Sequence, residues 1–371
     1  CALPISSTGN GSCLPVNDAM TITFTPAPIV DAGAGGAVCS NSPAIALNGS
    51  VTGATGGIWS GGAGTYSPNN TSLTATYTPT AAEIASGSVT LTLTSAGNGT
   101  CNPESDAVVW TFTPSPTAGA GADQTLCANN ADAMLNGSFT VATGAVWSGG
   151  GGSFSPSPTN MGATYTPTPA EIASGSVTLT LTTTGNGGCV AATDQVQLTF
   201  TPAPVANAGP DLSVCSNNAN VTLAGAVTGA TGGVWSGGAG SFLPNNTALN
   251  ATYTPTSAEI AAGVMTLTLT TTGNGTCNAV TDQVQIAFTP APVVNAGADG
   301  AVCANNAAIA LNGAVTGATG GTWSGGSGTF SPNANTLNAS YTPSAAEITA
   351  GSVTLTLTSA GNGTCNAVSD Q

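Results

Sequence analysis

The chain has 371 residues with no lysine, arginine or histidine, against 15 aspartates and glutamates, so its formal net charge is −15. Without cationic side chains it cannot neutralise phosphates, which excludes nucleic acid as a partner, and an anionic membrane surface repels it. The side chains that most often act in acid–base and anion-stabilising catalysis are also missing. No apolar run reaches transmembrane length, so direct membrane insertion is not expected.

A Gly-Asn-Gly triplet recurs every 88 residues, starting at Gly9, Gly97, Gly185, Gly273 and Gly361. The chain holds about 4.2 such periods, and a unit of this size can bury its own core. We therefore predict tandem small domains. Residues 1–27 are the C-terminal part of a preceding repeat, 28–115, 116–203 and 204–291 are full repeats, and 292–371 is a repeat lacking its last strand. Both ends fall inside a repeat, so we expect an excerpt of a longer chain.

The partial repeat at the start is predicted to end with a strand at Thr21–Phe24. In the first full repeat, Ile29–Cys39 reads as a strand interrupted by glycines, and Ile45–Val51 marks a second strand. Leu73–Tyr77 is another alternating segment. The Thr80-Ala81-Ala82-Glu83 stretch has the pattern of a capping box at a short helical turn.

The hairpin that closes each repeat has the clearest pattern. Val177, Leu179 and Leu181 alternate with threonines, which predicts a strand with one buried face. Gly185-Asn186-Gly187 follows and predicts a type I′ turn, and a second strand covers Gln195–Phe200.

About seven short strands per repeat, with cysteines and a central tryptophan, predict an immunoglobulin-like β-sandwich. The fold class is therefore all-β, a tandem array of such domains, with a parallel β-helix as the weaker alternative. Pro-x-Pro at each boundary predicts stiff linkers, and hence a semi-rigid rod of roughly 30 Å per repeat. The predicted core tryptophans are Trp59, Trp147, Trp235 and Trp323.

Nine of the ten cysteines fall in two series at steps of 88: one is Cys13, Cys101, Cys189, Cys277 and Cys365, the other Cys39, Cys127, Cys215 and Cys303. This pattern predicts structural disulfides formed in an oxidising compartment. Zinc binding is less favoured because the chain has no histidine and no CxxC pair. Cys1 breaks the register and has no assigned role.

Two disulfide pairings remain open. In an immunoglobulin-like order, Cys39 lies at the bottom of its domain and Cys101 at the top, too far apart for a disulfide. This favours pairs between adjacent repeats: Cys39–Cys189, Cys127–Cys277 and Cys215–Cys365. A short or displaced first strand would instead allow pairs within each repeat: Cys39–Cys101, Cys127–Cys189, Cys215–Cys277 and Cys303–Cys365.

Catalysis is not predicted. Glu83 and Asp106 form the best carboxylate pair, but their copies recur in every repeat, which is unusual for an active site. We treat Asp31, Asp123, Asp211 and Asp299 as one recurring position and as weak candidates for Ca²⁺, which prefers oxygen ligands. An aspartate at a strand edge more often binds backbone amides, so no metal or cofactor is expected, with Ca²⁺ as the alternative.

Segments such as Asn207-Ala208-Gly209-Pro210-Asp211 followed by Val214-Cys215 resemble the opening of PKD-like domains. The same likeness is seen in Gly273-Asn274-Gly275-Thr276-Cys277 and in Thr281-Asp282-Gln283-Val284. With these segments included, the whole chain resembles the tandem repeats of giant Bacteroidota cell-surface proteins, including SprB-like gliding-motility adhesins. The resemblance implies export by the type IX secretion system and attachment at the outer surface.

We therefore expect a structural stalk or filament segment of a large secreted cell-surface adhesin. Its expected partners are extracellular surfaces or polysaccharides, and neighbouring copies in a filament. One alternative is a glycan-binding module array with Trp59 and its copies as stacking platforms. The other is the spacer region of a large extracellular enzyme. Exposed tryptophans would favour glycan binding, and buried ones the stalk.

Overall fold

The computed structural model describes residues 3–9 and 11–371. Cys1 and the Asn10 of the first Gly-Asn-Gly triplet lie outside the described residues. By compactness the chain divides into two units, one made of Cys1–Thr125 with Asp132–Thr199, the other of Leu126–Ala131 with Phe200–Gln371. The predicted repeat boundaries are finer than this division and remain a prediction.

The chain starts with a hairpin in which β1 (Leu3–Ser6) pairs antiparallel with β2 (Asn17–Met20). The strand predicted at Thr21–Phe24 is not formed, so that prediction is wrong. The ladder of this hairpin has Leu3↔Met20 as its last pair, and Thr21–Phe24 lie beyond it.

The first full repeat is built from two main sheets. The larger has the spatial order β4 (Gly36–Cys39), β11 (Ser105–Thr113), β10 (Ser88–Ala96) and β7 (Gly56–Ser60). Its β4 and β11 run parallel and the other neighbours antiparallel. The smaller sheet has the order β5 (Ile45–Ala46), β9 (Thr76–Thr78) and β8 (Thr65–Ser67), and β3 (Ile29–Asp31) pairs with β6 (Ser50–Thr52).

The predicted strand at Ile45–Val51 is thus two strands, β5 and β6, in different sheets. Leu47 and Gly49 lie between them, and their amides donate to the backbone carbonyls of Ala75 and Leu73. The predicted strand at Leu73–Tyr77 is shorter and shifted, with β9 at Thr76–Thr78. The two predicted segments, Ile45–Val51 and Leu73–Tyr77, are therefore still joined by backbone hydrogen bonds where the regular strand ladder ends.

The two sheets enclose one apolar core. Val89, Leu91 and Leu93 of β10 are buried, as the alternation predicts. They belong to the same buried cluster as Ile45 and Tyr77 of the smaller sheet. Two facing sheets joined through such a core form a β-sandwich, and the fold is all-β and immunoglobulin-like.

The capping box is confirmed at α1 (Ala81–Ser86). The Thr80 side chain accepts from the Glu83 amide, and the Glu83 carboxylate accepts from the Thr80 amide. The same arrangement begins the corresponding helices α2 (Pro169–Ser174), α3 (Ser257–Ala262) and α4 (Ala345–Ala350).

The closing hairpin departs from the predicted type I′ turn. In the second repeat β19 ends at Thr184 and β20 begins at Thr193, so residues 185–192 form a longer loop. Positive φ angles occur at Gly185 (64°) and Gly187 (61°) but not at Asn186, whereas a type I′ turn needs them at both central residues. The buried Thr183 holds the loop, because its Oγ1 accepts from the Ala192 amide at 2.8 Å.

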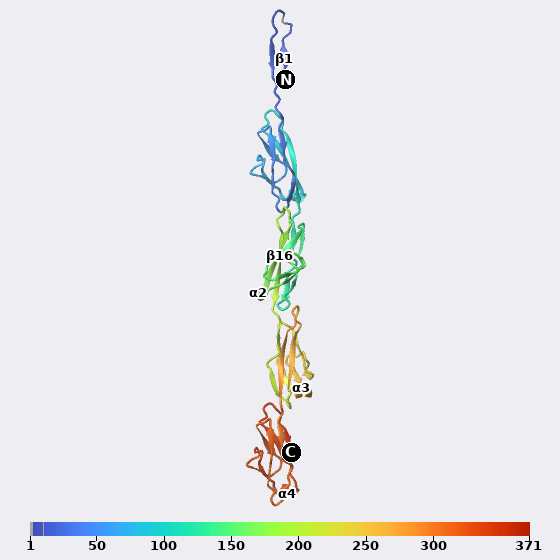
Figure 1. Cartoon of the computed structure of the whole chain (residues 1–371), viewed down its shortest axis with the longest axis vertical. Helices are drawn as coiled ribbons and strands as arrows, with labels where there is room; N and C mark the ends of the chain where they lie inside the picture. The colour runs from blue at the N-terminus through green and yellow to red at the C-terminus, as the bar shows by residue number, and fades with distance from the viewer. Residues whose placement is uncertain (1–2, 10) are drawn as a thin grey trace. The chain divides into compact units, whose positions relative to one another are not determined.

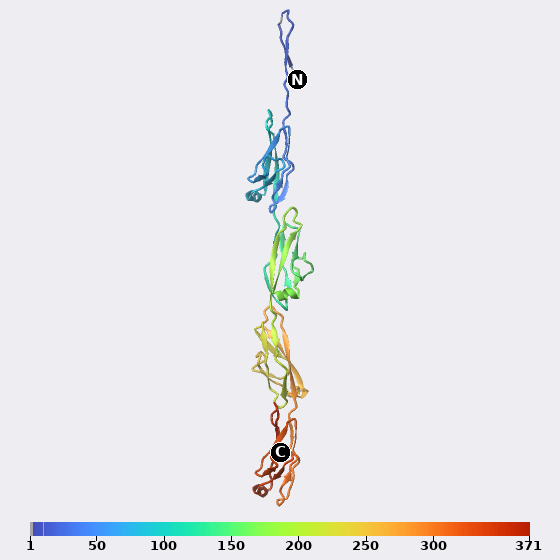
Figure 2. The same ribbon diagram turned by 90° about the vertical axis from the view of Figure 1, so that its left-hand side faces the viewer.

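The second and third repeats have the same strand order as the first, whereas the larger sheet of the fourth has three strands and none equivalent to β4 among the described residues. In Figure 1, and in the turned view of Figure 2, the strands of each repeat form a group of their own with its own range of colour. The second repeat contains β12 (Thr117–Gly119), β13 (Gln124–Cys127), β14 (Ala133–Met134), β15 (Ser138–Thr140), β16 (Gly144–Ser148), β17 (Ser153–Ser155), β18 (Thr164–Thr166), β19 (Ser176–Thr184) and β20 (Thr193–Thr201). The third contains β21 (Val205–Asn207), β22 (Leu212–Cys215), β23 (Val221–Thr222), β24 (Ala226–Thr228), β25 (Gly232–Ser236), β26 (Ser241–Leu243), β27 (Thr252–Thr254), β28 (Val264–Thr272) and β29 (Thr281–Thr289). The fourth contains β30 (Val293–Asn295), β31 (Ile309–Ala310), β32 (Ala314–Thr316), β33 (Gly320–Ser324), β34 (Thr329–Ser331), β35 (Ser340–Thr342), β36 (Thr356–Ala360) and β37 (Ser369–Asp370).

Candidate functional site

The recurring cysteines join adjacent repeats. The structure contains Cys39–Cys189, Cys127–Cys277 and Cys215–Cys365, each with a Cα–Cα distance of 5.0 Å and a sequence separation of 150. Of the two pairings left open by the sequence, this is the one between adjacent repeats. Cys13, Cys101 and Cys303 are the free cysteines among the described residues.

The parallel pairing of β4 with β11 explains how Cys39 reaches the next repeat. The register Thr113↔Cys39 places Cys39 beside the point where the chain leaves the sheet. The Ser40 amide also donates to the Thr113 carbonyl at 2.9 Å. The Sγ atom of Cys189 lies 3.7 Å from the Pro114 carbonyl oxygen, so the disulfide sits against the backbone linker. Each such joint therefore has two covalent connections side by side.

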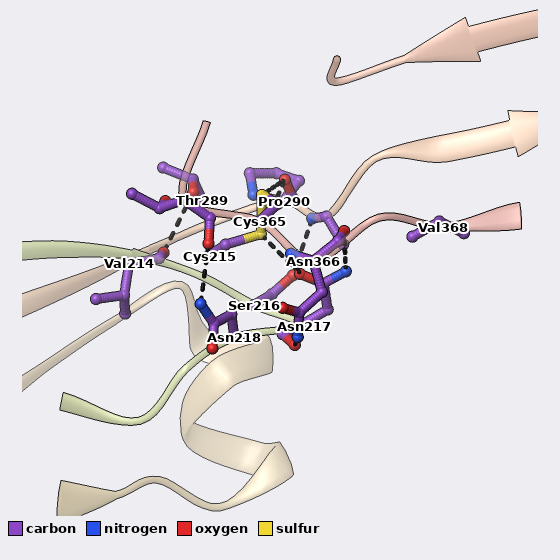
Figure 3. Close-up of a disulfide and its surroundings, with 12 residues drawn as sticks. Val214, Cys215, Ser216, Asn217, Asn218, Thr289, Pro290, Cys365, Asn366 and Val368 are labelled. Atoms are coloured by element: carbon purple, nitrogen blue, oxygen red, sulfur yellow. Dashed lines mark hydrogen bonds between the residues drawn. A yellow bond between two sulfur atoms is a disulfide. The ribbon is translucent and has the colours of Figure 1, made fainter. Parts of the chain in front are cut away.

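Asparagines reinforce the joint between the third and fourth repeats (Figure 3). Asn217 Nδ2 donates to the Asn366 carbonyl at 3.0 Å, and the Asn366 amide donates to Asn217 Oδ1 at 3.0 Å. Asn366 Nδ2 donates to the Asn217 carbonyl at 2.7 Å, and Asn218 Nδ2 to the Thr364 carbonyl at 3.0 Å. We call this set of bonds the asparagine clamp.

The clamp recurs with variation at the other disulfides. At Cys127–Cys277, Asn129 and Asn278 make the same reciprocal bonds, and Asn130 Nδ2 donates to the Thr276 carbonyl. At Cys39–Cys189, Asn41 exchanges bonds with the Val190 backbone. Val190 has no side-chain amide to donate the bond that Asn278 and Asn366 donate, and Ser42 stands in the place of Asn130 and Asn218. The sequence-based predictions did not single out these asparagines, although an Asn stands two residues after each of Cys39, Cys127, Cys215 and Cys303, at steps of 88.

The aspartates considered for Ca²⁺ do not share one position. Asp31 is four residues out of register with Asp123, Asp211 and Asp299, so that grouping is wrong. Asp31 stands where the third and fourth repeats have asparagine, and its Oδ1 accepts from the Gly33 amide as Asn207 Oδ1 does from Gly209.

Two of the in-register aspartates, Asp123 and Asp211, bind backbone in their own repeats. Asp123 Oδ1 accepts from the Gln197 amide and Asp211 Oδ1 from the Gln285 amide, both at 2.8 Å. Asp106 Oδ2 accepts from the Ala32 amide at 2.9 Å, as do its copies from the corresponding amides. Within the described ranges, no group of three or more Cys, Asp or Glu side chains is placed to hold a metal ion.

Glu83 has a structural role in its repeat. Its Oε1 accepts from Tyr77 Oη at 2.6 Å and from the Ala63 amide at 2.8 Å, and its Oε2 accepts from the Thr80 amide at 2.8 Å. Burial raises the pKa of this carboxyl, but the hydrogen bonds outweigh burial and lower the pKa to about 2. Burial and the bond to Glu83 raise the pKa of Tyr77 to about 12. The pair links the helix N-terminus to the smaller sheet.

The four repeat tryptophans are buried, with exposed fractions of 0% for Trp59 and Trp235, 2% for Trp147 and 3% for Trp323. The indole Nε1 of Trp59 donates to the Leu73 carbonyl, and those of Trp235 and Trp323 to the equivalent carbonyls. A side chain buried in this way has no free face on which a sugar could stack. The observation removes the feature on which the glycan-binding alternative rested.

No protein-family model matches the chain, and no curated protein matches it. Among solved structures, the chain is similar to the cis-dimer structure of protocadherin gammaB7 (13% identity, TM-score 0.34, 93% of this chain and 98% of that chain). It is also similar to an I-band fragment of titin (11% identity, TM-score 0.38, 72% and 100%) and to mouse cadherin-23 domains (12% identity, TM-score 0.32, 71% and 99%). At these values the likeness carries no argument for a function.

In the described part of the chain, none of the helices has the length and apolar character needed to cross a bilayer.

Proposed function

We propose that this chain is a segment of the stalk of a large secreted cell-surface adhesin. The observation that carries the proposal is the joint, where a disulfide and an asparagine clamp stand beside the backbone linker. A second covalent connection restricts bending and rotation between repeats, which an array of independent binding modules on flexible linkers does not require. A stalk requires this restriction, because it must hold its end away from the cell.

The surface location rests on chemistry of the same chain. Disulfides persist in oxidising, extracellular compartments. The absence of lysine and arginine leaves trypsin-like proteases no cleavage site, which suits an exposed protein. Export by the type IX system, a part in gliding motility, and partners such as polysaccharides or neighbouring copies rest on the resemblance to Bacteroidota surface adhesins.

Immunogold electron microscopy of intact producing cells tests the proposal, with an antibody raised against one repeat and the pre-immune serum as control. Gold along filaments that project from the cell surface is the expected result. Antigen found free in the medium, with no gold on cells, would contradict it and favour the spacer of a released enzyme.

A further inference from the structure

The disulfides change how far the chain can lengthen under tension. Cys39 and Cys365 are 326 residues apart in sequence. With Cys39–Cys189 and Cys215–Cys365 closed, the shortest covalent path between them crosses both disulfides and uses only the 26 backbone steps from Cys189 to Cys215. The maximum end-to-end length of a crosslinked chain is set by its shortest path, whether or not its domains are folded.

The lengths involved differ about tenfold. At ~3.5 Å per residue, 326 steps extend to about 1,100 Å. The short path extends to about 100 Å, including 5.0 Å across each disulfide. Residues 40–188 and 216–364 lie in closed loops, so unfolding them adds no length between Cys39 and Cys365.

The strand parts of the short path are already extended. Most of the segment from Cys189 to Cys215 is strand, in β20, β21 and β22. Strand backbone already rises about 3.3 Å per residue, against a limit of about 3.6 Å. The strand parts of this segment can therefore lengthen by only about a tenth under tension.

We propose that the disulfides and the strands between them form a covalent load path that limits how far the chain can extend between Cys39 and Cys365. Tension passes through the Cys39–Cys189 disulfide, the β20–β22 segment and the Cys215–Cys365 disulfide. The remainder of each repeat is held outside the path. This inference deepens the proposed stalk function. Its test uses the isolated chain, so the load path can be disproved while the proposed surface location still holds. The surface location can likewise be disproved while the load path still holds.

The test is single-molecule pulling of the oxidised 371-residue chain through peptide tags at its two termini. Segments 1–39 and 365–371 add the same length in every form. Between Cys39 and Cys365 we expect at most about 100 Å at high force, and a gain of about 1,000 Å when dithiothreitol is added. A limit of about 300 Å would indicate within-repeat pairing, and about 1,100 Å without reductant would indicate no crosslinks. Either result would overturn the proposal.

Two matched double variants separate the load path from a general effect of disulfides. In Cys39→Ser with Cys189→Ser, the shortest path becomes 88 steps to Cys127 and 62 steps from Cys277 back to Cys215. The limit then rises by about 430 Å. In Cys127→Ser with Cys277→Ser the short path is untouched, and the limit stays at about 100 Å. Equal lengthening of both variants would contradict the proposal. Peptide mapping without reductant first verifies the remaining disulfides of each variant. The readout then depends only on these covalent connections, whether or not the repeats stay folded during pulling.

Discussion

At the scale of single residues, the second repeat carries a backbone conformation that its side chain disfavours. Val141 has a φ angle of 67°, at the position where Gly53, Gly229 and Gly317 have 78°, 69° and 77°. A positive φ angle is a rare conformation for a β-branched residue, since its Cβ crowds the neighbouring carbonyl. The other repeats avoid this cost with glycine.

We predict that Val141→Gly raises the free energy of unfolding of the second repeat by about 1–2 kcal/mol. Hydrogen exchange of β19 amides, read by mass spectrometry in the full chain, measures the change as slower exchange. The control is Gly229→Val in the third repeat, where a Cβ would lie 3.1 Å from the Pro204 Cα and should destabilise. Unchanged or faster exchange in Val141→Gly would contradict the strain argument.

A second residue-scale prediction concerns acid. The pKa values of Glu83, Glu171 and Glu347 are about 2 in the folded chain, against 4.5 for an unperturbed glutamate. Because folding lowers these pKa values, the ionised carboxylates stabilise the fold fully above about pH 5. That contribution is lost as the pH falls from about 4.5 towards 2.

Urea denaturation at a series of pH values should therefore show a plateau above pH 5 and a decline below it. Glu83→Gln should be less stable than the wild type at neutral pH, and the first repeat should lose part of its pH dependence. A decline of equal steepness in wild type and variant would show that other groups carry the effect.

At the scale of elements, the joints differ in polar contacts although their disulfides have the same Cα–Cα distance. Asn217 and Asn366, with the bond from Asn218 to Thr364, form the full asparagine clamp, whereas Asn41 binds only the Val190 backbone. We predict that Asn217→Ala increases exchange of the Asn366 amide about 2- to 12-fold, since a net hydrogen bond contributes about 0.5–1.5 kcal/mol. Hydrogen exchange by NMR measures it.

The matched control for this prediction is Asn41→Ala, which should affect the Val190 amide and leave Asn366 unchanged. Peptide mapping without reductant should find Cys215–Cys365 intact in Asn217→Ala. The digestion needs chymotrypsin or an acid-specific protease, because trypsin has no site in this chain. An unchanged Asn366 exchange rate would show that the clamp adds nothing to the disulfide.

At the scale of the whole molecule, every charged side chain is negative. With 15 carboxylates and no basic side chain, acidification removes nearly all charge instead of reversing it. We predict that solubility falls below about pH 4 and does not recover at pH 2, whereas proteins with basic residues become cationic and redissolve. Turbidity and light scattering between pH 7 and pH 2 measure this. Recovery at pH 2 would contradict the expectation.

Local sequence determined most of the fold. The alternation in β10, the capping box at Thr80 and the burial of Trp59 all follow from residues near one another in the chain. The period of 88 then assigns the same elements to each repeat. The Gly-Asn-Gly turn was mistaken for a type I′ turn because the long loop depends on a buried hydroxyl such as that of Thr183, which contacts a residue nine positions away.

The joints were decided only by tertiary structure. The sequence alone defined which cysteines recur and excluded cationic partners, but it left two pairings open because both satisfy the same spacing. The structure has Cys39 with Cys189 because parallel pairing of β4 and β11 brings Cys39 to the exit of its repeat. The asparagine clamp likewise joins residues 149 apart. Contacts at that separation are set by where the strands end, and no local pattern encodes them.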